Sequence, residues 1–262
     1  MNKFLSIPAI ALLALTFSFQ SCKKDDDLTD DTTPTPATTG SIRMSFVDMF
    51  GDSLLDLGTE NYVTANNDTV VCNTFKYYIS NIRFTDMDGN SWYEPESYHL
   101  VDASIASSQS FVISGLPFAH YTSVSYMIGV DSARNVSGAQ TGALDPANDM
   151  FWTWNTGYIM AKFEGQSPQS TASAHNVTYH IGGFAGANAS QRNVTISFGT
   201  MHAMVSESVT PVVTFKADAA EWFKTPNLLS IATLPNTTMP GAAAMSIADN
   251  YADMFSLISV QN

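Results

Sequence analysis

The chain has almost no cysteine. Its 262 residues include 2 cysteines, Cys22 and Cys72. Cys22 ends an apolar N-terminal run, where we expect it to be modified, so Cys72 would have no partner for an internal disulfide. A fold held together by disulfides is therefore excluded. Cys72 is expected to be a small buried hydrophobe, and a thiolate metal ligand is the alternative.

Positive charge is also scarce. There are 11 Lys and Arg residues against 24 Asp and Glu residues, and the formal net charge is −13. A chain this acidic is unsuited to binding nucleic acid or an anionic membrane through a basic patch, so no nucleic-acid partner is expected. The sequence also lacks G-x-S-x-G, H-E-x-x-H, C-x-x-C and P-loop signatures. It therefore indicates a binding protein and not an enzyme.

The N-terminal apolar run, Phe4 to Phe19, is too short and too close to the N-terminus for a stable membrane span. Because it follows the positive Lys3, we interpret residues 1–21 as a secretory signal peptide. Its end, Phe19-Gln20-Ser21-Cys22, resembles a lipoprotein signal, in which the cysteine is lipidated and begins the mature chain. The alternative is ordinary cleavage near Ser21 with an incidental cysteine.

Residues 22–40 are predicted to be a lipidated tether and disordered linker. The charged run Lys23-Lys24-Asp25-Asp26-Asp27 is typical of a solvated segment. The rest, up to Gly40, is rich in Asp, Thr and Pro and cannot bury a core. The Lys-plus-acid run also resembles the signal that sends some Gram-negative lipoproteins to the cell surface. We therefore expect an outer membrane lipoprotein on the cell surface, with the periplasmic face as the alternative.

Residues 41–262 are predicted to form one all-β domain, a single β-sandwich of seven to nine mostly antiparallel strands with one or two short helices. Apolar and polar residues alternate from Ile42, and Phe75 to Phe84 reads as another strand. Short helices are expected over Ala217–Phe223 and Ala243–Leu257. The polar stretch Asp131–Asp149 lacks any period, so we expect a loop that is either functional or disordered.

Histidines are the first candidates for metal ligands. His175 and His180 are five residues apart, which would place them on opposite faces of a regular strand. Met201-His202-Ala203-Met204 offers imidazole and thioether donors, which suit Cu(I). The alternatives are that each histidine is structural and that the two methionines pack into the core.

The densest aromatic feature is the run from Phe151 to Tyr158, which contains Trp152 and Trp154. If the run is extended, the two tryptophans lie on one face. It could cap a core, grip a peptide or a glycan, or place a tryptophan where it does chemistry. The sequence leaves these alternatives open.

Four segments together resemble the MbnP-like (methanobactin-associated) copper-binding protein family, in order and in spacing. They are Lys76-Tyr77-Tyr78-Ile79-Ser80-Asn81-Ile82-Arg83, Ile128-Gly129-Val130-Asp131, Met150-Phe151-Trp152-Thr153-Trp154-Asn155-Thr156-Gly157-Tyr158 and Tyr179-His180-Ile181-Gly182-Gly183. The resemblance covers most of residues 42–223, and the tryptophan segment is its most specific part.

The resemblance implies an exported β-sandwich that binds copper through histidine and an oxidised tryptophan, kynurenine, made by a di-haem peroxidase partner. It implies His180 as one ligand and Trp152 or Trp154 as the modified residue. The family often has an Asn-His pair after the Gly-Val turn, but here Val136 follows Asn135. We therefore expect His202 or His175 to take the place of the absent ligand. A cysteine that many members carry after the histidine stretch is also absent, since Phe184 to Ala187 occupy that region.

Overall fold

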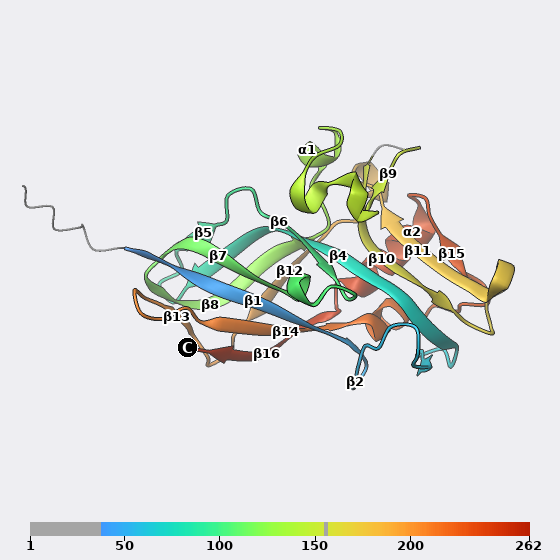
Figure 1. Cartoon of the computed structure of the whole chain (residues 1–262), viewed down its shortest axis with the longest axis horizontal. Helices are drawn as coiled ribbons and strands as arrows, with labels where there is room; N and C mark the ends of the chain where they lie inside the picture. Colours follow the sequence, from blue (N-terminus) through green and yellow to red (C-terminus); the bar gives the residue numbers. More distant parts are fainter. Residues whose placement is uncertain (1–37, 155–156) are drawn as a thin grey trace, which may run out of the picture. The chain divides into compact units, whose positions relative to one another are not determined.

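The computed structural model describes residues 38–154 and 157–262. Within them the chain forms 16 β-strands, two α-helices and six short 3-10 turns (Figure 1). None of the described helices is long and apolar enough to cross a membrane. The predicted signal peptide, Cys22 and most of the predicted tether lie outside the described residues, so these assignments stay predictions.

The smaller sheet has five strands and is built around β1 (Thr39–Phe50). β1 pairs in parallel with β14 and antiparallel with β7 and β2, and β16 extends the sheet by pairing antiparallel with β14. The bounds are β2 (Ser53–Leu54), β7 (Ser110–Pro117), β14 (Val212–Asp218) and β16 (Phe255–Gln261). Ile42, Met44 and Phe46 are buried at alternate positions of β1, so one face of this sheet forms core.

The larger sheet has eleven strands and is built around the long strand β4 (Thr69–Asp86). Its main path runs β12 (Arg192–Ser197), β8 (Ala119–Ile128), β4, β10 (Gly157–Gln166), β11 (Asn176–Gly182) and β15 (Asn236–Thr237). Short strands add to it: β3 (Tyr62–Val63), β5 (Ser91–Tyr93), β6 (Tyr98–Asp102), β9 (Phe151–Trp152) and β13 (Ala203–Val205). β9 pairs with β10, and β13 pairs with β8.

Aromatic side chains join the two sheets. Phe46 of β1 lies edge-on to Tyr77 of β4, with ring centres 6.1 Å apart, and Phe215 of β14 lies 6.3 Å from Tyr126 of β8. The main core is therefore a layer of interlocking rings between the inner faces of the sheets. The expectation of a mostly β domain with short helices is confirmed, but the strands outnumber the predicted seven to nine because many have only two or three residues.

The helices match the sequence expectations in part. The turn η6 (Ala219–Phe223) lies within the segment predicted as a short helix from Ala217, whose first two residues instead end β14. It begins after Asp218, whose carboxylate accepts the N–H of Ala220. The closing helix α2 (Ala242–Tyr251) stops early, and the remaining residues form β16. The prediction of helix up to Leu257 was wrong because residues 255–261 find hydrogen-bonding partners along β14. The remaining helical segments are η1 (Ala106–Gln109), α1 (Ser132–Asn135), η2 (Gly142–Leu144), η3 (Pro146–Asn148), η4 (Ser173–His175) and η5 (Gly186–Asn188).

Cys72 and Asp48 are both buried within this core. Cys72 is fully buried, as expected for a small hydrophobe. Asp48 occupies an inward position of β1, where its carboxylate accepts hydrogen bonds from the Tyr77 hydroxyl (2.9 Å) and the Gln109 amide (3.0 Å). Burial raises the pKa of Asp48 to about 6, although both hydrogen bonds act to lower it. The core therefore contains a carboxyl group that titrates in a mildly acidic medium.

This burial makes the stability of the fold depend on pH. An unfolded Asp titrates near pH 4, so the folded protein holds the Asp48 proton more tightly, and stability falls as pH rises from about 4 through about 6. Asp48→Asn keeps the shape of the side chain and stays neutral. Its free energy of unfolding should exceed that of the parent by roughly 1 to 3 kcal/mol at pH 8 and differ little from it at pH 4. Urea unfolding at both pH values measures this. Equal effects at both would contradict the assignment.

Candidate functional site

The predicted loop Asp131–Asp149 folds onto the outer face of the larger sheet and closes a second apolar cluster there. The cluster joins Leu144 of the loop to residues of β4, β9 and β10 and to two residues just outside strands, Val130 after β8 and Met150 before β9. The strand residues are Tyr78, Trp152, Tyr158, Ile159 and Met160. The Tyr78 hydroxyl donates to the Ala143 carbonyl (2.9 Å), and the Tyr158 hydroxyl donates to the Leu144 carbonyl (2.8 Å). The loop is thus a folded cover, with α1 and β9 above the sheet (Figure 1).

Asn135 connects the turn at Gly129-Val130 to the start of β10 by hydrogen bonds. Its amide nitrogen donates to the carbonyls of Val130 (2.7 Å) and Asp131 (2.9 Å), and its oxygen accepts the N–H of Tyr158 (2.8 Å). The side chain is 2% exposed. Since all three bonds go to backbone, Asn135 has a structural role, and the exposed Val136 beside it offers no ligand.

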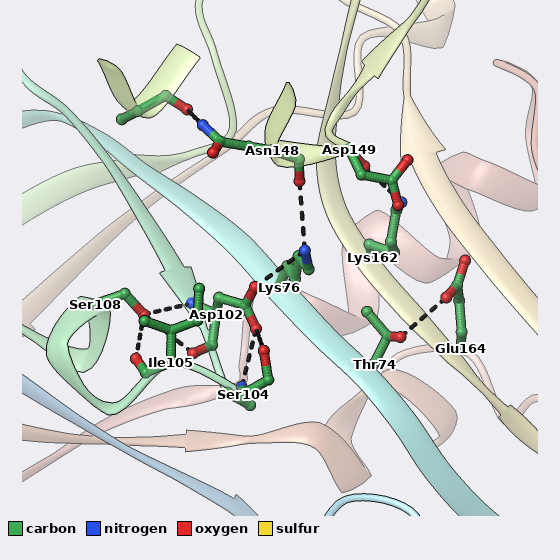
Figure 2. A network of polar contacts seen from close by, with 12 residues as sticks. Thr74, Lys76, Asp102, Ser104, Ile105, Ser108, Asn148, Asp149, Lys162 and Glu164 are labelled. Carbon is green, nitrogen blue, oxygen red and sulfur yellow. Dashed lines mark hydrogen bonds and ion pairs between the residues drawn. The ribbon is translucent and has the colours of Figure 1, made fainter. Parts of the chain in front are cut away.

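Below the cover, two lysines hold the loop to the sheet (Figure 2). Lys162 of β10 is 1% exposed, and its ammonium group donates to the carbonyl (2.5 Å) and the carboxylate (2.7 Å) of Asp149. The adjacent Lys76 of β4 forms an ion pair with Asp102 (3.0 Å) and donates to the Asn148 carbonyl (3.4 Å). Both cations therefore stabilise the end of the loop that leads into Met150.

His180 lies on the same outer face, on the strand next to Lys162. Its Nε2 is 2.6 Å from a carboxylate oxygen of Glu164, and the other oxygen of Glu164 accepts from the Thr74 hydroxyl (2.9 Å). The hydrogen bond with His180 is the main reason that the pKa of Glu164 falls to about 2; the Thr74 hydroxyl and the Lys162 charge also lower it, against the effect of burial. Glu164 is thus an ionised acceptor that fixes the imidazole.

Trp152 lies directly over Gly182, two residues beyond His180 on β11. A Cβ atom added at Gly182 would come within 2.5 Å of the Trp152 ring, so the close contact depends on glycine. Because residues 180 and 182 point to the same side of a strand, His180 and the Trp152 indole share one face of β11. A pocket of about 280 Å³ adjoins Trp152 and is lined by Trp152, Tyr158, Phe184, Asn188 and Pro240 among others.

Trp152 and Trp154 differ in environment. The extended run expected here ends after Trp152, which is 5% exposed, while Trp154 follows in a turn and is 59% exposed. The two ring centres are nevertheless 5.4 Å apart. One tryptophan thus faces the site and the other faces solvent, in contact with each other.

The other predicted ligands lie elsewhere. His175 is in η4, outside β11, with a backbone φ of 56° and its Nδ1 3.0 Å from the Ser170 carbonyl oxygen. His202 precedes β13 and lies beside His120. Across residues 38–154 and 157–262, no group of three or more His, Cys, Asp or Glu side chains is arranged to hold a metal ion. The described part of the site therefore brings together His180, Glu164 and Trp152.

The protein is thus a two-sheet β domain in which a folded loop and Trp152 cover the outer face of the larger sheet. Comparison with known proteins gives its family. The family model of MbnP matches residues 39–240, and the chain belongs to the MbnP family. The solved structure of MbnP from Methylosinus trichosporium is similar to it, with a TM-score of 0.56 and 12% sequence identity over 86% of this chain and 99% of that one. At that identity the likeness shows the fold. The comparison with curated proteins finds no match.

Lys162 offers a direct test of how the cover is held. In Lys162→Met the ammonium is lost, while Asp149, whose side chain is 80% exposed, can turn to water. We expect the free energy of unfolding of this variant to fall by roughly 1.5 to 3 kcal/mol and amide hydrogen exchange to become faster across residues 131–154. Lys224→Met is the matched control, because Lys224 pairs with Glu221 at a site where it is 53% exposed. Unchanged loop exchange in Lys162→Met would show that the apolar cluster alone holds the cover.

Proposed function

We propose that this protein is an exported, membrane-anchored lipoprotein that binds copper through His180 and an oxidised tryptophan, and that it is a metal-binding protein rather than an enzyme. The observation that carries the proposal is the contact of Trp152 with Gly182 on the face of β11 that also holds His180. Membership of the MbnP family supports the same conclusion.

His180 has the second-sphere partner that a metal-binding histidine needs. Metal-binding imidazoles usually donate their other N–H to a carboxylate, which fixes the ring and makes the ligand nitrogen more basic. With the proton on Nε2, His180 donates to Glu164 and has Nδ1 available for a metal. Imidazole nitrogen is a preferred ligand of copper.

Trp152 is a poor ligand before it is modified, because an indole N–H only donates. Conversion to kynurenine would open the five-membered ring and leave an aromatic amine and a ketone as nitrogen and oxygen donors. Two equivalents of hydrogen peroxide, used by a di-haem peroxidase partner, would each supply one oxygen atom to the indole and release the other as water, which gives N-formylkynurenine. Hydrolysis then releases the ring C2 carbon as formate. Trp154, which is exposed and in contact with Trp152, is the alternative residue for modification.

The described donors fit only part of a copper site. His180 and a modified Trp152 supply an imidazole and a kynurenine, but no group of three or more His, Cys, Asp or Glu side chains in the described residues completes a metal site. Of the other predicted ligands, His175 lies in η4 and His202 lies beside His120. The exposed Val136 occupies the position at which the family often has one. We therefore infer that tight binding of copper at this site depends on oxidation of the tryptophan.

The test is copper content before and after modification. Protein made without a peroxidase should bind copper weakly at this site, and co-expression with a di-haem peroxidase should add the mass change of kynurenine at Trp152 or Trp154 and raise the affinity. His180→Asn should then lose that copper while keeping its fold, whereas His175→Asn should retain it. Full copper occupancy in folded, modified His180→Asn would remove His180 from the site. Native protein without copper or kynurenine would refute the proposal.

A second function has one observation in its favour. The pocket of about 280 Å³ beside Trp152 combines aromatic walls with the polar residue Asn188, and the exposed Trp154 lies in contact with Trp152. Aromatic faces beside polar groups suit a sugar or a peptide. Binding of glycans or peptides to native protein that lacks copper would favour this role.

Membrane attachment is tested separately. The lipoprotein-like signal ending at Cys22 supports an outer membrane position, on the cell surface or on the periplasmic face. Cys22→Ala should move the protein to the soluble fraction, because a lipid anchor holds the chain only when its cysteine is acylated. Cys72→Ala is the control and should stay with the membrane. A Cys22→Ala variant that remains membrane-bound would contradict the anchor.

A further inference from the structure

Histidines and a methionine meet where β8 begins beside β13. The cluster consists of His120, His202 and Met204 and is called here the His120–His202 patch. His120 and Met204 are direct partners across the two strands. Met204 is 38% exposed, as is the adjacent Met201, so the alternative that these methionines pack into the core is wrong.

Strand geometry puts His120 and Met204 on one face, and His202, which precedes β13, joins them through its position beside the His120 ring. Ala203 and Val205 of β13 are buried, so Met204 between them points outward. Tyr121 of β8 is buried, so its neighbour His120 points outward. Met204 is outward on β13, His202 is two residues before it, and His120 is opposite Met204. The three donors therefore share the outer surface of the sheet, within the range of direct and diagonal cross-strand contacts.

The two imidazoles are spaced as ligands of one metal ion. Their ring centres lie 6.2 Å apart, and the rings are inclined by 59°. An ion bound about 2.0 Å from one nitrogen of each ring puts the ring centres about 5 to 6.4 Å apart, depending on the angle at the metal. The observed separation fits two imidazoles at a wide angle, with the thioether of Met204 as a third ligand.

The backbone around the patch is held in place. The side-chain amide of Asn262 donates to the His202 carbonyl (3.0 Å), and its oxygen accepts the N–H of Met204 (2.7 Å). On the other side, the N–H of Met87 donates to the His120 carbonyl (2.9 Å), and the thioether-bearing side chain of Met87 is 60% exposed. A cavity of about 550 Å³ lined by Asp86, Met87 and His120, among others, adjoins the patch and gives it an acidic surround.

We propose that His120, His202 and Met204 form a surface site for Cu(I), separate from the Trp152 site. Two imidazoles with a thioether are ligands suited to Cu(I). His120 and Ile128 are eight positions apart on β8, which corresponds to about 26 Å of strand, and Ile128 lies near the second apolar cluster. Figure 1 accordingly shows β13 and β9 well apart. The patch is accessible from solvent, so its copper is exchangeable.

The test uses Cu(I) alone, titrated without oxygen against a colorimetric Cu(I) chelator, with the purified full chain made without a peroxidase. The parent should bind one tight equivalent of Cu(I), and His120→Asn, His202→Asn and Met204→Leu should each weaken or lose it. The matched controls are His175→Asn and Met239→Leu, since Met239 is 61% exposed and outside the patch. His180→Asn and Trp152→Phe should still bind one tight equivalent of Cu(I), which distinguishes copper in the His120–His202 patch from copper at the Trp152 site.

X-ray absorption identifies the ligands directly. The Cu(I)-loaded parent should show nitrogen and sulfur neighbours, and Met204→Leu should lose the sulfur. If Met204→Leu keeps the sulfur neighbour of copper, Met87→Leu and Met201→Leu show which thioether supplies it. Loss of that sulfur in either of these two variants would overturn the role of Met204. Tight Cu(I) binding that persists in the folded double variant His120→Asn/His202→Asn would overturn the site. Absence of tight Cu(I) binding in the parent would overturn it equally.

Discussion

The buried ammonium group of Lys162 is the constraint from which the candidate site follows. Lys162 lies in the middle of β10 and is 1% exposed, so its charge needs acceptors within reach. A buried cation without a partner is strongly destabilising. Asp149 provides a carbonyl and a carboxylate at once, and this obliges the end of the loop to return to the sheet. Met150 and Trp152 follow directly and are carried into the second apolar cluster.

The long strand β4 explains why a cover can form on this sheet at all. Near its start it pairs with β10, and further along it pairs with β8, with a register shift on the way. Its outward side chains therefore serve two surroundings. Lys76 belongs to the polar network, and Tyr78 belongs to the apolar cluster. A layer of ion pairs thus borders a layer of aromatic rings, and His180 occupies the polar side while Trp152 occupies the apolar side.

Alternation of apolar residues predicted the β class and the inward face of β1, and the density of aromatic residues suggested the segment from Phe151 to Tyr158 as a site. It could not give cross-strand register, which decides that Glu164 meets His180 and that His120 faces Met204. The cover was read as a loop without a period because Leu144 and Met150 are too few to make a pattern, and Asn135 acts through backbone groups that no residue pattern shows. The polar sequence Asp-Pro-Ala-Asn-Asp gave no sign that its last residue would pair with a buried lysine.

The parallel pairing of β1 and β14 has a mechanical consequence. β1 is the first described strand, and it is flanked by β14 on one side and β7 on the other. Tension applied at Thr39 along the strand would load both ladders in shear, so many hydrogen bonds would have to break together rather than one after another. If the chain is held from its N-terminal side, a pulling force therefore acts first on β1, which both of its neighbouring strands hold against unfolding.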